Sequence, residues 1–138
     1  MADQSLKNKK IIISAGASGI GLAIVKICLS RGAIVFVNDL NQKYINKLNN
    51  NNFFNKRLFT FKGDSSNEYE VKKFFDFIIK KTKKIDALIN NVGIAGPTAT
   101  LEKINSTEWE KTLKVNVTSH YYFSKLAIPM LKKNKGGS

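Results

Sequence analysis

The segment SAGASGIGLAIV, residues 14–25, follows a short apolar run and leads into a helical pattern. The run before it, KKIIIS at 9–14, reads as a strand, and apolar residues recur at helical spacing after the glycines. Glycines allow a backbone to approach a phosphate closely, and a helix N-terminus offers free N–H groups and about half a positive charge. This order of strand, glycine turn and helix predicts a pyrophosphate-binding turn, with an ordinary tight turn as the alternative.

Strand patterns and helical patterns alternate along the sequence. The expected strands cover residues 9–14, 33–39, 57–64 and 85–90, and a helical pattern follows each one. Ser65 and Glu68 form a capping-box pattern before the third helix. Continuous apolar strands joined by helices favour a parallel sheet covered on both faces, with the strand order 3-2-1-4 if the chain reverses after the third strand. We therefore expect one Rossmann-like, doubly wound α/β domain over residues 1–138.

Asp39 stands at the end of the second expected strand, after the glycine turn. In a dinucleotide-binding fold an acid at this place accepts hydrogen bonds from the hydroxyls of the adenosine ribose. Its charge also repels the 2′-phosphate of NADP. We therefore predict NAD as the cofactor in preference to NADP. The alternative is a loop aspartate that starts the next helix.

The net charge of +13 raises the question of a nucleic-acid partner. The lysines are scattered, however, and the sequence has no arginine-rich or aromatic-interleaved strip. We expect no nucleic acid as partner and keep a basic nucleic-acid binder only as a rival hypothesis. No apolar run approaches the roughly 20 residues of a membrane-spanning helix, so we expect no membrane partner either.

The sequence holds one cysteine and one histidine. Cys28 cannot form an internal disulfide, which fits a reducing compartment, and we expect the protein in the cytoplasm. One histidine without a Cys/His cluster cannot build a metal site, so we expect no metal. We expect His120 on a helix surface and Cys28 on an apolar helix face.

Four motifs in the same order resemble the short-chain dehydrogenase/reductase family, over about residue 9 to the last residue. The family's T-G-x-x-x-G-x-G motif corresponds to residues 14–21, where Ala15 replaces the first glycine. If this position has a positive φ, the alanine costs on the order of 1 kcal/mol. Asp64 with Ser65, the segment NNVG at 90–93 and the segment KVNV at 114–117 resemble the family's next motifs.

The resemblance implies an oxidoreductase that transfers a hydride between NAD(H) and a small carbonyl or alcohol substrate. Asn116 corresponds to the family's catalytic asparagine, whose backbone holds a water of the proton relay. The positions that the resemblance and the glycine turn assign to the cofactor are Ser14, Gly16, Ser18, Gly19, Ile20, Gly21, Asp39, Leu40, Asp64, Ser65, Asn91, Val92 and Gly93.

Tyr121 and Lys125 have the Tyr-x-x-x-Lys spacing of the family's catalytic pair. Such a match is expected by chance in a lysine-rich chain, and in the family the pair follows a fifth strand. The expected last helix carries an apolar stripe made of Trp109, Leu113 and Val117. Tyr121 continues this stripe, which predicts that its side chain has a packing role. We therefore do not expect this pair to be catalytic.

The last residues, KKNKGGS at 132–138, resemble the turn that leads into the family's fifth strand. We therefore expect this chain to be the cofactor-binding half of the fold, truncated before strand 5, without the catalytic Ser, Tyr and Lys and inactive by itself. The resemblance implies a homo-oligomer. An uncovered fourth strand predicts marginal stability or self-association. The alternative function is a non-catalytic dinucleotide-binding or interaction module.

Overall fold

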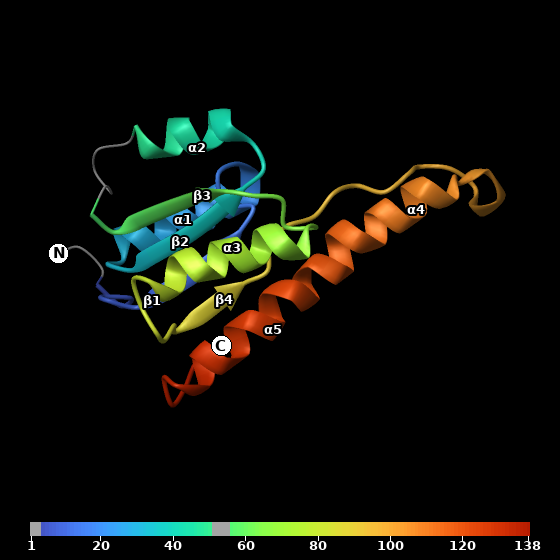
Figure 1. The fold of residues 1–138 in the computed structure, drawn as a ribbon. Helices are drawn as coiled ribbons and strands as arrows, with labels where there is room; N and C mark the ends of the chain where they lie inside the picture. The colour runs from blue at the N-terminus through green and yellow to red at the C-terminus, as the bar shows by residue number, and fades with distance from the viewer. Residues whose placement is uncertain (1–3, 51–55) are drawn as a thin grey trace.

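The computed structural model describes residues 4–50 and 56–138 and builds them around a four-stranded parallel sheet (Figure 1). The strands are β1 (Lys10–Ser14), β2 (Ile34–Asp39), β3 (Leu58–Lys62) and β4 (Ala87–Ile89). They lie in the order β3-β2-β1-β4, so the predicted strand order and the doubly wound fold are confirmed. Ile12 pairs with Phe36 of β2 on one side and with Leu88 of β4 on the other.

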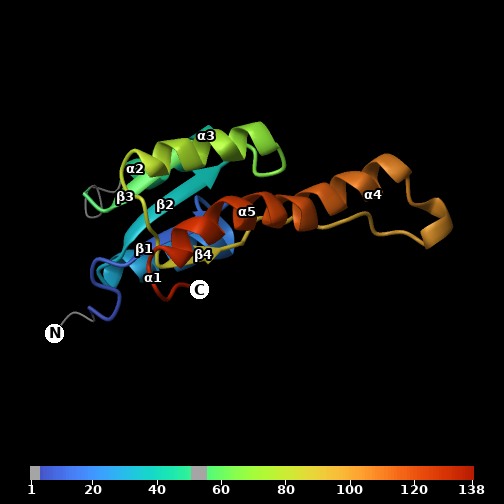
Figure 2. The same ribbon diagram turned by 60° about the horizontal axis from the view of Figure 1, so that its bottom comes forward.

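Helices cover both faces of the sheet (Figure 1 and Figure 2). α1 (Gly19–Ser30) and α2 (Gln42–Asn49) pack on one face, and α3 (Glu68–Ile79) and α5 (Ser119–Lys132) pack on the other. A short 3-10 turn, η2 (Leu101–Lys103), precedes the remaining helix, α4 (Ser106–Leu113). A π-helical segment, η3 (Lys114–Thr118), joins α4 to α5, and in it the N–H of Ser119 bonds the carbonyl of Lys114.

Side chains of β1 alternate between two apolar cores, because successive residues of a strand point to opposite faces. Ile11 and Ile13 join the core under α1 and α2, whereas Ile12 joins the core under α3 and α5. The second core is aromatic, and its fully buried rings belong to Phe36, Phe74, Phe75 and Phe123. Cys28 is buried in the first core, as predicted.

Helix α3 starts differently from the sequence prediction. Asn67 is its N-cap and accepts hydrogen bonds from the backbone N–H groups of Tyr69 and Glu70. Ser65 is buried instead, and its hydroxyl accepts a hydrogen bond of 2.8 Å from Asn38 Nδ2. The expected capping box is therefore wrong, because Ser65 bonds the end of β2 and Asn67 takes its place at the helix.

The two halves of the last long helix differ in burial. Helix α5 buries Phe123, Ala127 and Met130 against the sheet, whereas none of the residues of α4, all of which are described, is buried. Figure 2 shows α4 projecting beyond the sheet. The stripe expected to pack is exposed, with relative accessibilities between 44% and 60%: Trp109, Leu113, Val117 and Tyr121. The packing prediction for Tyr121 is thus wrong within this chain.

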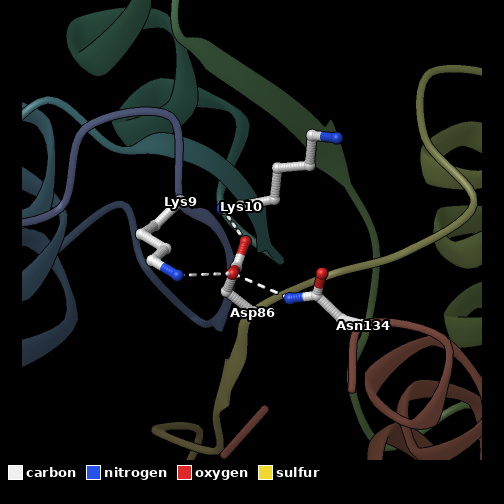
Figure 3. A network of polar contacts seen from close by, with 4 residues as sticks. All are labelled: Lys9, Lys10, Asp86 and Asn134. Carbon is white, nitrogen blue, oxygen red and sulfur yellow. Dashed lines mark hydrogen bonds and ion pairs between the residues drawn. The ribbon is translucent and has the colours of Figure 1, made fainter. Parts of the chain in front are cut away.

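One carboxylate joins three segments at the amino end of the sheet (Figure 3). Asp86, just before β4, accepts hydrogen bonds from Lys10 N at 2.8 Å, Lys9 Nζ at 3.1 Å and Asn134 Nδ2 at 2.8 Å. Burial alone would raise the pKa of Asp86, but these hydrogen bonds outweigh burial and hold that pKa below its ordinary value. The network fixes β1, β4 and the turn after α5 to one another.

Candidate functional site

The glycine turn lies between β1 and α1, at the carboxyl end of the sheet. Ala15 has a φ of 50°, so the non-glycine residue at this position is held in the left-handed region, as the sequence analysis considered. A Cβ on Gly16 would lie 2.8 Å from Val37 Cγ1, and one on Gly21 would lie 2.5 Å from both Ala15 O and Asn91 Nδ2. Both glycines are therefore required for close packing of the turn.

The N-terminus of α1 differs from those of the other helices that follow a strand or loop. Ser18 is its N-cap but makes no side-chain capping bond within the described structure, and the first turn holds no acidic residue. In contrast, α2, α3 and α4 are capped by the side chains of Asn41, Asn67 and Asn105. The first N–H groups of α1 are thus available to an anion, and the helix dipole favours one.

Asn38 and Asp39 end β2 beside the turn, and both are buried. Asp39 is 7% exposed; its Oδ2 accepts from Ala17 N at 3.0 Å and its Oδ1 from Asn41 N at 2.9 Å. Asn38 Nδ2 donates to Gly63 O and Ser65 Oγ, which ties β2 to the end of β3. Sequence reasoning missed Asn38; a buried amide at the end of a strand was the available signal.

The segment after β4 is attached to the glycine turn by side chains. Ser14 Oγ accepts from Asn91 N at 2.9 Å and from Val92 N at 3.1 Å. Asn91 Nδ2 donates to Ser14 O and Ala15 O, each at 3.0 Å. Two members of the predicted cofactor set, Ser14 and Asn91, therefore hold the turn and the loop together through their side chains.

Asn116 lies in the π-helical segment η3 and holds the segment after β4 at Ile94. Its Oδ1 accepts from Ile94 N at 2.8 Å, and its Nδ2 donates to Ile94 O at 2.9 Å. Both polar groups of one side chain are thereby paired with both backbone groups of one residue. The side chain of Asn116 therefore clamps the backbone of Ile94.

A cavity of about 340 Å³ lies among these elements. Five of the predicted cofactor positions line it: Asp39, Leu40, Asp64, Ser65 and Val92. Two cations, Lys111 of α4 and Lys114 of η3, also line it, and the remaining lining residues are Ala15, Ser66, Ile94 and Val115. Asp64 Oδ1 accepts from Ser66 N and Ser66 Oγ, so this carboxylate also shapes the rim. The remaining predicted positions belong to the turn, to the exposed start of α1 and to the loop: Gly16, Ser18, Gly19, Ile20, Gly21 and Gly93.

The Tyr121 and Lys125 pair lies elsewhere. Lys125 lines a different cavity of about 540 Å³ between α3 and α5. Its Nζ lies 3.3 Å from Glu68 Oε1 and 5.6 Å from the centre of the Tyr121 ring. The hydrogen bond to Glu68 is the main cause that raises the pKa of Lys125. The ammonium is therefore paired with a carboxylate outside the cavity that Asp39 lines.

His120 is the second residue that sequence reasoning missed. It is partly buried rather than a surface residue, and its Nε2 lies 2.9 Å from Val92 O. Among the described residues, no three His, Cys, Asp or Glu side chains form a group that could hold a metal ion. In residues 4–50 and 56–138, no helix has both the length and the apolar composition to span a bilayer.

Comparisons with known proteins agree with this arrangement. The family model described as short chain dehydrogenase matches residues 9–138. A 7alpha-hydroxysteroid dehydrogenase of Paraclostridium sordellii is 34% identical over 96% of this chain and 51% of its own length. A dehydrogenase/reductase SDR family member 4 of Caenorhabditis elegans is 31% identical over 96% of this chain and 52% of its own length.

A solved structure described as ElxO with NADP bound superposes with a TM-score of 0.86 at 22% identity and covers 94% of this chain and 53% of that one. At this identity the likeness concerns the fold. The chain spans about half the length of the curated relatives that it matches. The motif order, the strand order and the match over residues 9–138 agree, and the chain belongs to the short-chain dehydrogenase family of oxidoreductases.

Proposed function

We propose that this chain binds NAD(H) in the cavity at the carboxyl end of the sheet, as the cofactor-binding part of an oxidoreductase. The observation that carries the proposal is the shared cavity: residues at the ends of all four strands line it, beside an α1 N-terminus without a side-chain cap. In a parallel α/β sheet, ligands bind outside the carboxyl ends of the strands. Lys111 and Lys114 add positive charge that favours a phosphate-bearing ligand.

The residues fit the two parts of a dinucleotide. The first N–H groups of α1, with Gly19 open to solvent on its Cβ side, would bind the pyrophosphate. Each oxygen of Asp39 accepts one backbone hydrogen bond and keeps capacity for one more, so the carboxylate would accept from ribose hydroxyls. Bound NAD(H) would supply the hydride that is exchanged with a small carbonyl or alcohol substrate. This chain's own residues bind and orient it.

The preference for NAD over NADP rests on the charge of Asp39. A 2′-phosphate about 4 Å from this carboxylate would be repelled by about 4 kcal/mol at an effective dielectric of 20. If solvent and the nearby lysines screen three quarters of this, about 1 kcal/mol remains, which is about fivefold in affinity.

Titration of the chain with NADH and with NADPH tests this function. We expect NADH to bind about fivefold more tightly than NADPH. Asp39→Asn should reduce the ratio of the NADPH dissociation constant to the NADH dissociation constant. This ratio should fall even if the loss of a backbone hydrogen bond weakens the binding of both cofactors. The ratio is the useful readout because general damage to the turn cancels in it. Tighter binding of NADPH by the unmodified chain would refute the preference, and binding of neither would refute the function.

Asn116 stays a proposed catalytic residue through its main chain, as the family resemblance implies. Its side-chain clamp on Ile94 supports this, because it holds the η3 backbone and the loop in a fixed relation. We also propose that a substrate-turnover assay of residues 1–138 alone shows no activity. NAD(H) binding without turnover by any form of the protein would favour the alternative, a non-catalytic dinucleotide-binding module.

Compartment, oligomeric state and domain division are the remaining parts of the proposal. The free, buried Cys28 fits a reducing compartment, and we propose the cytoplasm. The exposed apolar stripe that runs from Trp109 on α4 to Tyr121 on α5 supports a homo-oligomer, which sedimentation would test. We keep residues 1–138 as one proposed domain.

A further inference from the structure

The loop at 91–94 is held in place by side chains from other elements. Asn91 N and Val92 N donate to Ser14 Oγ at the end of β1, and both backbone groups of Ile94 bond Asn116. Val92 O accepts from His120 at the start of α5. Backbone polar groups need partners, and here the partners of a cavity-lining segment are three side chains on three elements, β1, η3 and α5.

The role of His120 in this contact follows from the acceptor. A carbonyl oxygen cannot donate, so the 2.9 Å contact requires a proton on His120 Nε2. The imidazole therefore donates to Val92 O from one side while Ser14 Oγ accepts from Val92 N on the other. The backbone of Val92, a wall of the cavity, is fixed at both of its polar groups.

The next residue explains why a clamp at this carbonyl matters. Gly93 has no Cβ, and a Cβ placed there would meet Asn116 Oδ1 only at the ordinary distance of 3.6 Å. The peptide between Val92 and Gly93 is therefore weakly restricted by its own side chains, and glycine permits rotations that other residues do not. A hydrogen bond to the carbonyl of that peptide selects one orientation.

We infer that His120 is a positioning residue of the cofactor site: its Nε2–H holds the Val92 carbonyl and thereby keeps the loop wall of the cavity in its binding geometry. This inference rests on the proposed function for its consequence in cofactor binding. The contact itself can be tested without cofactor. His120 does not touch the proposed ligand position; it acts through the backbone of Val92 and Gly93.

The experiment compares two substitutions in the full 138-residue chain. His120→Gln keeps an N–H donor on a side chain of similar reach, whereas His120→Leu removes the donor and keeps apolar bulk. NADH titration should give nearly unchanged affinity for His120→Gln and about three- to tenfold weaker binding for His120→Leu, the range for one hydrogen bond of ordinary net strength. Tyr121→Phe, on the exposed neighbouring position, is the control and should leave the affinity unchanged.

Nitrogen NMR of the unmodified chain gives a readout that does not depend on NADH. The chain has one histidine, so a single imidazole is observed, and its neutral form should carry the proton on Nε2. The Gly93 amide signal should broaden in His120→Leu and stay sharp in His120→Gln. A proton on Nδ1 alone, or equal NADH affinity in both variants, would overturn the inference. If the unmodified chain binds no NADH, the proposed function fails, and the tautomer and the Gly93 signal still decide the clamp.

Discussion

Each end of the sheet carries a cavity and a buried or half-buried carboxylate. The two carboxylates differ in how many further hydrogen bonds they can accept. The cavity beside Asp86, at the amino end, has about 420 Å³ and exceeds the 340 Å³ cavity beside Asp39. Asp86 already accepts three hydrogen bonds, two of them from cationic or amide side chains, whereas Asp39 accepts two from backbone N–H groups. Spare bonding capacity beside an uncapped helix start, rather than size, distinguishes the candidate site.

The largest expected effect at the carboxyl end comes from Gly21→Ala. Its Cβ would lie 2.5 Å from Ala15 O and from Asn91 Nδ2, and neither atom can retreat without breaking the bonds that hold the turn. We expect the free energy of unfolding to fall by about 1–3 kcal/mol. NADH affinity should fall at least about tenfold, because the turn must open to admit the methyl group. Chemical denaturation and NADH titration measure the two effects.

Gly137→Ala is the control at the amino end. Its Cβ would meet Leu131 Cδ2 at 2.5 Å and Asp86 O at 3.1 Å, far from Asp39. The Leu131 methyl group can move, so this clash is milder than the backbone clash at Gly21. It should lower the free energy of unfolding and leave NADH affinity unchanged. If both variants weaken NADH binding equally, the comparison between the two ends breaks down, and the loss reflects general destabilisation.

Asp86→Asn tests the amino end directly, with a smaller effect. The substitution removes the charge that pairs with Lys9 and that strengthens the bonds from Lys10 N and Asn134. We expect the free energy of unfolding to fall by about 1 kcal/mol at neutral pH, since hydrogen bonds to a partly exposed charge are of this order. NADH affinity should not change. A changed affinity would show that Asp86 affects binding at the proposed cofactor site at the other end of the sheet.

The effect of Asp86→Asn on the free energy of unfolding should depend on pH. Because the folded pKa of Asp86 is lowered, its ionised form stabilises the native state above the unfolded pKa of about 3.9, and this contribution is lost as pH falls through the folded pKa. The difference in unfolding free energy between the two proteins should therefore be constant near neutral pH and shrink below about pH 4. Denaturation curves at several pH values measure it; a gap that widens in acid would contradict the lowered pKa.

The sequence predicted the sheet but only part of what holds the site. Strand positions and order followed from local apolar patterns and the handedness of connections, as with Ile12 between Phe36 and Leu88. The contacts of Asn38 and His120 were missed because they join side chains to backbone groups more than twenty residues away. Neither composition nor periodicity records such pairs. Trp109 and Leu113 were misread for a related reason: an amphipathic stripe shows that a face is apolar and does not identify what covers it.

Ala15→Gly has the smallest expected effect and acts in the stabilising direction. Ala15 has a φ of 50°, which costs an L-residue on the order of 1 kcal/mol and costs glycine little. Glycine also makes the unfolded chain more flexible, so the net gain in unfolding free energy should be about 0.5 kcal/mol. Asn8, with a φ of 62° at the other end of β1, is the control: asparagine tolerates this region, so Asn8→Gly should gain less. Loss of stability in Ala15→Gly would mean that the methyl group packs usefully enough to outweigh its strain, and the turn would then be adapted to alanine.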